Sequence, residues 1–114
     1  MQAVVRVRVG GVALVAQQEA PGKAIVAELV PGTPARIVRL DGEQTRVLCA
    51  GPAVGPFDPG VGAILRLAIT GGRAQLERDG ASIVACDIDA PARGAWGVAA
   101  FGGEVVVDTV TVAR

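Results

Sequence analysis

The sequence contains no histidine and no tyrosine, and aromatic residues make up only 3% of it. Without histidine, neither the single serine, Ser82, nor the cysteines have the base that activates a nucleophile in Ser–His and Cys–His enzymes. The two cysteines also lack the spacing and the histidine partners of a zinc site. So few aromatic rings argue against a stacking platform for single-stranded nucleic acid.

Net charge and long apolar runs are also absent. Eleven basic residues balance eleven acidic ones, and Lys23 is the only lysine. A neutral chain has no long-range field that attracts nucleic acid or an anionic membrane. No stretch approaches the ~20 apolar residues of a membrane span. We therefore expect no nucleic-acid partner and no membrane insertion. The start, MQAVVRVRVGG, carries charges where a signal peptide needs an apolar core, so the localisation is left open.

What the sequence does contain is the pattern of β-strands. Hydrophobic residues make up 51% of the chain, mostly alanine and valine, which predicts one domain over 1–114 with a closely packed core of small side chains. Apolar and polar residues alternate between Gly, Pro and Asp-Gly turn signals. The pattern predicts about ten strands, no helix and an all-β antiparallel sandwich or barrel. The predicted strands cover 3–9, 12–16, 23–30, 35–40, 45–50, 63–70, 74–78, 82–88, 96–101 and 104–112.

The cysteines and the longest loop refine this prediction. Residues 51–61, GPAVGPFDPGV, have no periodicity and are expected to form the longest loop. An immunoglobulin domain needs a tryptophan between its two cysteines, whereas Trp96 follows both Cys49 and Cys86. We interpret the cysteines as free, buried thiols that act as small hydrophobes. The alternative is a disulfide, which requires that they face each other across a sheet.

The C-terminal half carries a succession of short motifs. The alternating strand Leu65–Ile69 leads to a hairpin with an Asp79-Gly80 turn, and Ile83–Asp87 ends in an acid. A small-residue strand, Gly94–Val98, precedes a closing strand with an acid beside β-branched residues, Val107–Val112. In this order the motifs resemble the C-terminal half of a concanavalin A-like lectin/glucanase domain, the jelly-roll sandwich shared with laminin-G-like modules.

The resemblance implies an antiparallel jelly-roll sandwich, either as a compact variant or with N-terminal strands missing and the sheets completed by a neighbouring chain. Members of this family usually have several more strands at the N-terminus, and a sandwich without them would expose strand edges. We therefore expect a homo-oligomer, or completion of the sheet by another chain. The valine-rich surface, such as Val4, Val105 and Val107, favours such an assembly. The family also suggests an extracellular protein.

For function, the resemblance implies a non-catalytic module that binds carbohydrate or a surface polymer. The alternative is a structural subunit that associates with other chains through its sheets. Glucanases of this type use an E-x-D-x-x-E strand, which the sequence lacks. The acid pair Asp87 and Asp89 is interpreted as a solvated strand end rather than as an acid/base or cation site. We expect no enzymatic activity.

Sugar sites in this family usually combine an aromatic platform with polar side chains, and neither asparagine nor tyrosine is available here. The candidate ligand-binding residues are therefore Trp96 and Phe57. The alternative for Trp96 is a core or interface residue. The alternative for Phe57 is an anchor for the long loop.

In the closing strand, GGEVVVDTVTV, the preferred apolar face changes at Asp108, an acid that lies between β-branched residues. A β-bulge at Asp108-Thr109 would turn Val107, Val110 and Val112 inward and Asp108 outward. The family resemblance also makes Asp108 a candidate calcium ligand. A single carboxylate is a poor calcium site, because the ion takes about 6–8 oxygens. No other cofactor is expected.

Overall fold

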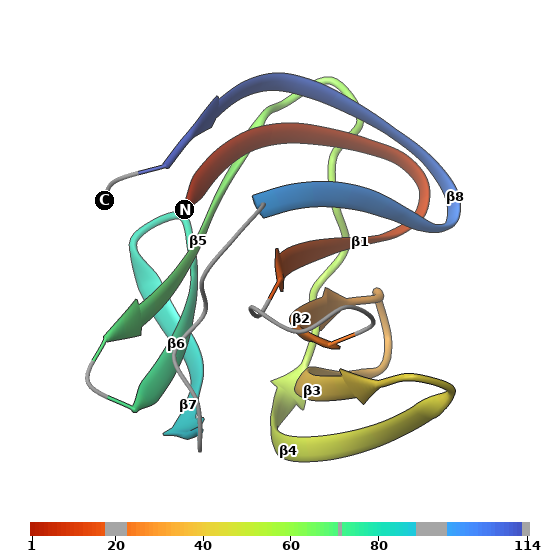
Figure 1. Ribbon diagram of the computed structural model, residues 1–114. Coiled ribbons are helices and arrows are strands. Elements are labelled where there is room, and N and C mark those ends of the chain that lie inside the picture. The colour runs from red at the N-terminus through yellow and green to blue at the C-terminus, as the bar shows by residue number, and fades with distance from the viewer. Residues whose placement is uncertain (18–22, 71, 89–95, 113–114) are drawn as a thin grey trace.

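Two long strands, β1 (Gln2–Gln17) and β8 (Trp96–Thr111), pair antiparallel over most of their length and form a bent ribbon. The structure is a computed structural model, and it describes residues 1–17, 23–70, 72–88 and 96–112. Figure 1 shows that both strands fold back near their middles, so that each has two arms. The bends contain Gly10 and Gly102, whose φ angles of 74° and 68° are in the left-handed region that glycine adopts without strain.

The two arms of β1 start two different layers of strands. Its first arm pairs with β5 and its second arm pairs with β2, while β8 lies along the other edge of both. The strand order is β4-β3-β2-β1-β5-β6-β7, with every pairing antiparallel. These strands are β2 (Lys23–Leu29), β3 (Pro34–Asp41), β4 (Gln44–Ala53), β5 (Ala63–Thr70), β6 (Arg73–Arg78) and β7 (Ala81–Asp87).

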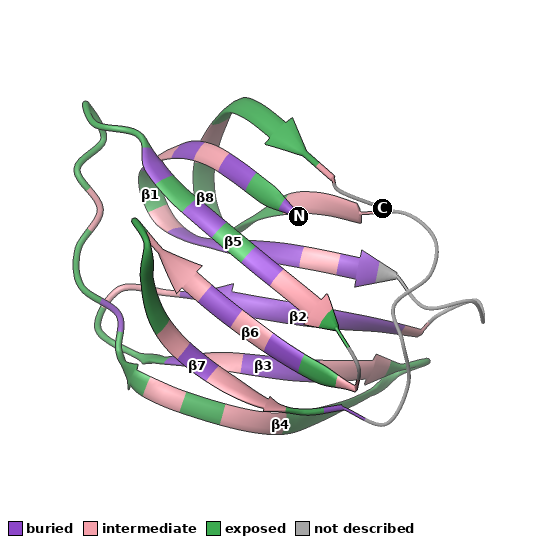
Figure 2. Cartoon of the chain, turned by 90° about the vertical axis from the view of Figure 1, so that its left-hand side faces the viewer, coloured by how far each residue is buried: buried purple, intermediate pink, exposed green. Residues whose placement is uncertain are grey.

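The main core lies between these two layers. Side chains alternate along each strand, so one face of every layer is apolar. In β5, for example, Ala63, Leu65 and Leu67 are buried, whereas Ile64 and Arg66 between them are exposed, and Figure 2 shows this striping. The largest fully buried side chains are Leu14, Ile25, Leu29, Ile37, Leu65, Leu67 and Leu76. The fold is therefore an all-β antiparallel sandwich whose layers share a bent ribbon.

A disulfide between Cys49 of β4 and Cys86 of β7 joins the two ends of the strand order. The prediction of two free, buried thiols was wrong, and the alternative that we left open is the one observed. The cysteines are 37 residues apart in sequence, and β4 and β7 lie at opposite ends of the strand order. They come into contact because the sheet curls round on itself. Glycine at position 51 permits this approach, because a Cβ atom there would lie 2.8 Å from the carbonyl oxygen of Ile83.

The predicted strands agree with the observed ones except at the Gly-Gly pairs. We predicted strand breaks at Gly10-Gly11 and Gly102-Gly103, but each pair lies inside one bent strand, and the described residues form eight strands in place of about ten. The end of β4 also extends to Ala53, into the predicted loop. Two of the turn signals between the predicted strands, Pro21-Gly22 and Gly71, lie outside the described residues. In the described part of the chain, no helix has the length and apolarity that a membrane span requires.

Candidate binding site

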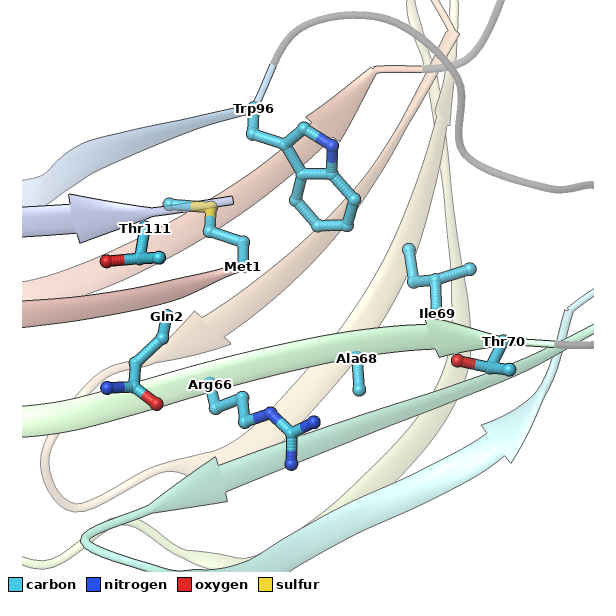
Figure 3. Close-up of a pocket in the computed structure, with 8 residues that line it drawn as sticks. All are labelled: Met1, Gln2, Arg66, Ala68, Ile69, Thr70, Trp96 and Thr111. Atoms are coloured by element: carbon cyan, nitrogen blue, oxygen red, sulfur yellow. The ribbon is translucent and has the colours of Figure 1, made fainter. Parts of the chain in front are cut away.

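A cavity of about 300 Å³ opens at the end of the sandwich where the two termini of β8 meet β1 and β5. Figure 3 shows the Trp96 indole extending from β8 toward Ile69, with Arg66 and Ala68 further along β5. The side chains around this space include an aromatic ring, a guanidinium, an amide and two hydroxyls. The lining residues are Met1, Gln2, Arg66, Ala68, Ile69, Thr70, Trp96 and Thr111.

The bend in β8 is what brings Trp96 and Thr111 to the same cavity. They are the first and last residues of a strand of 16 residues. In a straight strand they would be roughly 50 Å apart, at about 3.3 Å per residue. Because the strand folds back at Gly102 and Gly103, the two ends return to one end of the sandwich (Figure 1). The glycine-rich stretch therefore positions the site although it does not line it.

Strand register places the polar side chains of the site in one row. Gln2 of β1 is opposite Thr111 on one side and Arg66 on the other, and Arg66 is opposite Glu77 of β6. Directly opposed side chains in antiparallel strands point to the same face. Arg66 Nη1 donates a hydrogen bond to Glu77 Oε2 at 3.2 Å, which orients the guanidinium. The other guanidinium nitrogens of Arg66 can still donate, since arginine has five N–H groups.

The rim beside this row is fixed by Met1. Its amino group donates to the Leu67 carbonyl oxygen at 2.9 Å, and the Leu67 N–H donates to the Met1 carbonyl oxygen at 2.9 Å. Burial, followed by the nearby Arg66 charge, lowers the pKa of the Met1 amino group below its ordinary value of 8.0. These bonds extend the pairing of β1 with β5 to the edge of the cavity, which makes one wall rigid.

The two aromatic candidates occupy different places. Trp96 is half-buried, packs against the main core and also lines the cavity. It therefore has features of both interpretations, a ligand-binding residue and a core residue. Phe57 is not among the residues that line the cavity. It packs against the core from the β4–β5 connection, and the Arg78 guanidinium lies 4.1 Å from its ring centroid. Arg78 also donates to the carbonyl oxygens of Gly55 and Pro56, at 3.0 and 2.8 Å. These contacts anchor the loop.

Asp108 is the extra residue of a β-bulge. Val4 is opposite Thr109 and Val5 is opposite Val107, so Asp108 has no cross-strand partner and the predicted bulge is confirmed. The predicted inward turn holds for Val112, which packs against the core, but it was wrong for Val107 and Val110, which are 43% and 45% exposed. The strand lies at the edge of the described sheet, where the bulge turns these side chains to the surface.

The Asp108 carboxylate makes an ion pair with Arg6. Arg6 Nη2 donates to Oδ1 at 3.1 Å and Nε donates to Oδ2 at 3.2 Å, so both carboxylate oxygens accept a bond from one guanidinium. Among the described residues, no group of three or more acidic, cysteine or histidine side chains could hold a metal ion. Calcium at Asp108 therefore stays a prediction. The other acid considered above, Asp87, makes an ion pair with Arg73 at 3.6 Å, and Asp89 lies outside the described residues.

Comparison with known proteins identifies the fold. No protein-family model matches this chain, and no curated protein matches it. Among solved structures, it is similar to the carbohydrate binding module CBM66 from Bacillus subtilis, with a TM-score of 0.76 and 12% sequence identity. The alignment covers 93% of this chain and 68% of that one. At this identity the likeness shows the fold alone, and it confirms the predicted all-β sandwich.

The polar residues of the cavity were missed by sequence reasoning. Gln2, Thr70 and Thr111 lie at the ends of predicted strands, where polar residues are common and indicate no site. The alternating pattern indicated only that Arg66 is one more outward-facing residue of its strand. The register of three strands that are not consecutive in the sequence, β8, β1 and β5, brings these residues together. No single stretch of the sequence contains that register.

Proposed function

We propose that this chain is a non-catalytic carbohydrate-binding module that holds its sugar in the Trp96 cavity. The observation that carries the proposal is the meeting of Trp96 with the row Thr111, Gln2 and Arg66 around one cavity of about 300 Å³. A volume of this size is at the lower end of small-molecule pockets, which suits one or two sugar rings. The similarity to a carbohydrate binding module supports this role. A concanavalin A-like relationship is part of the same proposal.

Each side chain has a distinct part in this proposal. The face of a sugar ring that carries C–H groups is apolar and packs against an indole, while the hydroxyls at its edge need hydrogen-bond partners. Arg66 supplies donors, and the Gln2 amide supplies both a donor and an acceptor. The hydroxyls of Thr70 and Thr111 act in either direction. Ala68 is small and lies on the face of β5 that carries Arg66, which leaves room for the ring beside the guanidinium.

The test compares cavity variants with matched variants outside the cavity, by calorimetry with a glycan identified on an array. Arg66→Met and Thr111→Val should each weaken binding, Arg66→Met by about tenfold or ~1.4 kcal/mol. The controls are Arg73→Met and Thr109→Val, which change the same residue types on neighbouring exposed positions that do not line the cavity. Equal losses in the cavity variants and in the controls would contradict the proposal, as would silence of the wild-type protein across the array.

A second candidate function is assembly through the edge of β8. In the described part of the chain, β8 pairs with β1 alone, and Val107 and Val110 on it are 43% and 45% exposed. Unpaired edges with apolar side chains favour pairing with another chain. Sedimentation velocity tests this function. A concentration-dependent dimer that Val107→Lys abolishes would support it, and a monomer at all concentrations would contradict it.

A further inference from the structure

A second cleft, of about 280 Å³, lies on the outer face of the β1–β2–β3 layer, beside the turn between β2 and β3. It is separate from the Trp96 cavity and shares no residue with it. It combines an ion pair, a threonine and several apolar side chains. The lining residues are Glu28, Val30, Thr33, Pro34, Arg36 and Phe101.

Small residues in the middle of the layer create this cleft. Register places Glu28 opposite Arg36 on one side and Ala13 on the other, and Ala13 is opposite Ala99. Residues two apart in a strand share a face, so Phe101 lies on the face of Ala99. Phe101 is itself opposite Gly11 of β1. Two alanines and a glycine therefore separate the ion pair from the phenylalanine ring.

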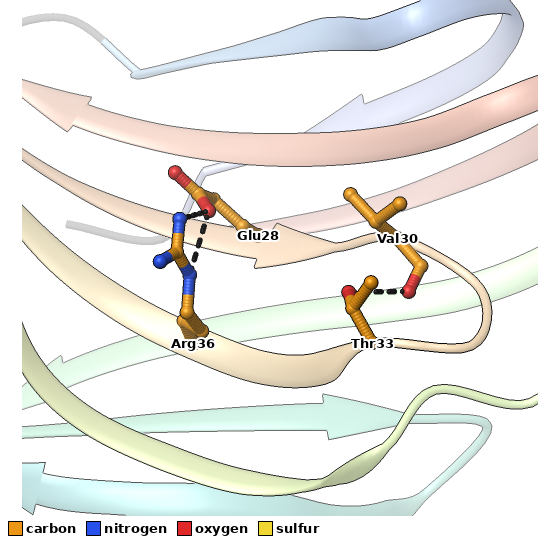
Figure 4. Close-up of polar contacts among 4 residues, drawn as sticks. All are labelled: Glu28, Val30, Thr33 and Arg36. Carbon is orange, nitrogen blue, oxygen red and sulfur yellow. Dashed lines mark hydrogen bonds and ion pairs between the residues drawn. The ribbon is translucent and has the colours of Figure 1, made fainter.

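Glu28 and Arg36 form a close, oriented ion pair. Arg36 Nη2 and Nε donate to Glu28 Oε2 at 2.6 and 3.1 Å. Figure 4 shows that the second carboxylate oxygen points away from Arg36. The Glu28 side chain is only 11% exposed. Beside the pair, Thr33 Oγ1 and its backbone N–H both donate to the Val30 carbonyl oxygen, at 2.8 and 3.1 Å, which fixes the turn that borders the cleft.

The packing of this face does not require an ion pair. The neighbouring side chains on the same face, from Ala13, Ala24, Val26 and Val38, form a small buried apolar cluster. The Arg36 side chain is 41% exposed, and an ion pair with an exposed partner contributes only about 0–1 kcal/mol to stability. A nearly buried carboxylate next to that cluster is thus better explained by a polar ligand than by stability. Phe101 adds an aromatic ring that is 43% exposed.

We propose that this cleft binds a neutral sugar ring. The ion pair has no net charge, so the cleft presents an acceptor in Glu28 and donors in Arg36 without selecting a charged ligand. Phe101 provides the apolar face against which the C–H side of the ring packs. The volume suits a single ring. This inference stands apart from the Trp96 cavity, because it uses other residues on another face.

The test is an NMR titration of ¹⁵N-labelled protein with glucose, galactose, mannose, fructose and xylose. The titration uses the Ala68→Leu variant, in which the larger side chain narrows the Trp96 cavity beside Arg66, so that binding there is weakened. We expect at least one sugar to shift the amides of Val30, Thr33 and Phe101. Phe101→Ala should weaken this binding by about tenfold or more. Val47→Ala is the matched control, since it removes an apolar side chain of similar exposure, 47%, outside the cleft.

Each of the following results would overturn the proposal. The first is no shift at these amides with any sugar in a folded protein. The second is equal binding by the Phe101→Ala variant. The third is a stronger response of the same amides to methylammonium, which would indicate a cation site. The double variant Glu28→Leu/Arg36→Leu separates binding from stability. It should keep the urea midpoint of the wild type and lose the sugar-dependent shifts, whereas retained shifts would exclude the ion pair from the site.

Discussion

Removing the Cys49–Cys86 disulfide should destabilise the protein more than most single substitutions do. The perturbation is Cys49→Ala with Cys86→Ala, which leaves small apolar side chains at both half-buried positions. The bond closes a loop of 37 residues between the outermost strands β4 and β7. For a loop of that length, loop-closure entropy in the unfolded chain is worth about 4 kcal/mol at about 25 °C. This is a large part of the roughly 5–15 kcal/mol by which a domain is stable.

Urea denaturation followed by circular dichroism measures this loss. We expect the unfolding free energy to fall by about 4 kcal/mol and the melting temperature by about 15 °C. The dependence of the unfolding free energy on urea should become steeper, because the unfolded chain without the cross-link exposes more surface. Wild-type protein under reducing conditions is the control and should give the same curve as the double variant.

A loss below about 1 kcal/mol would refute this reasoning about the disulfide. It would mean that the packing of β4 against β7, including the close approach at Gly51, already holds the two ends together. Binding assays should in either case be done without reductant, because disulfides persist in oxidising surroundings.

Three further variants test single features of the fold by urea unfolding. Gly11→Ala should lower the free energy of unfolding by about 3 kcal/mol, because its Cβ would collide with a carbonyl oxygen of β2. Gly97→Ala is the control, since a Cβ there meets no described atom within 4 Å, and it should change this free energy by no more than about 0.5 kcal/mol. Phe57→Ala should cost about 2 kcal/mol through lost packing and the lost Arg78 contact, and an unchanged midpoint would show that the loop needs no anchor. Asp108→Asn should cost less than about 1 kcal/mol, because its ion pair is partly exposed, and a larger cost would give the pair a structural role.

The fold class followed from local sequence because alternation and turn residues act over a few positions. The strand Ala63–Thr70 was predicted with its observed bounds, and the bulge at Asp108 followed from a change of apolar face within one stretch. The outcome at the two Gly-Gly pairs could not be predicted from local sequence. A local pattern records that the strand is interrupted, but whether it stops or bends depends on a partner strand that bends at the same level.

The site could be predicted only in part for the same reason. Trp96 was selected as one of few aromatic residues, and it does line the cavity. Its polar neighbours come from the other end of its own strand and from two strands elsewhere in the chain. The pairing of Cys49 with Cys86 is equally non-local, since it depends on how far the whole sheet rolls. Such contacts are set by tertiary register, which one sequence does not reveal.

The cavity beside Trp96 can be tested in a single measurement, a glycan array probed side by side with the wild-type protein and the Ala68→Leu variant. Ala68 lines the cavity on the face of β5 that carries Arg66, so leucine at this position blocks the space beside Arg66 without adding charge or replacing a core residue. We expect the wild type to bind a defined set of glycans and the variant to lose that binding while keeping the wild-type melting temperature. Equal binding by both proteins would place the sugar elsewhere, and a wild type that binds no glycan would contradict carbohydrate recognition itself.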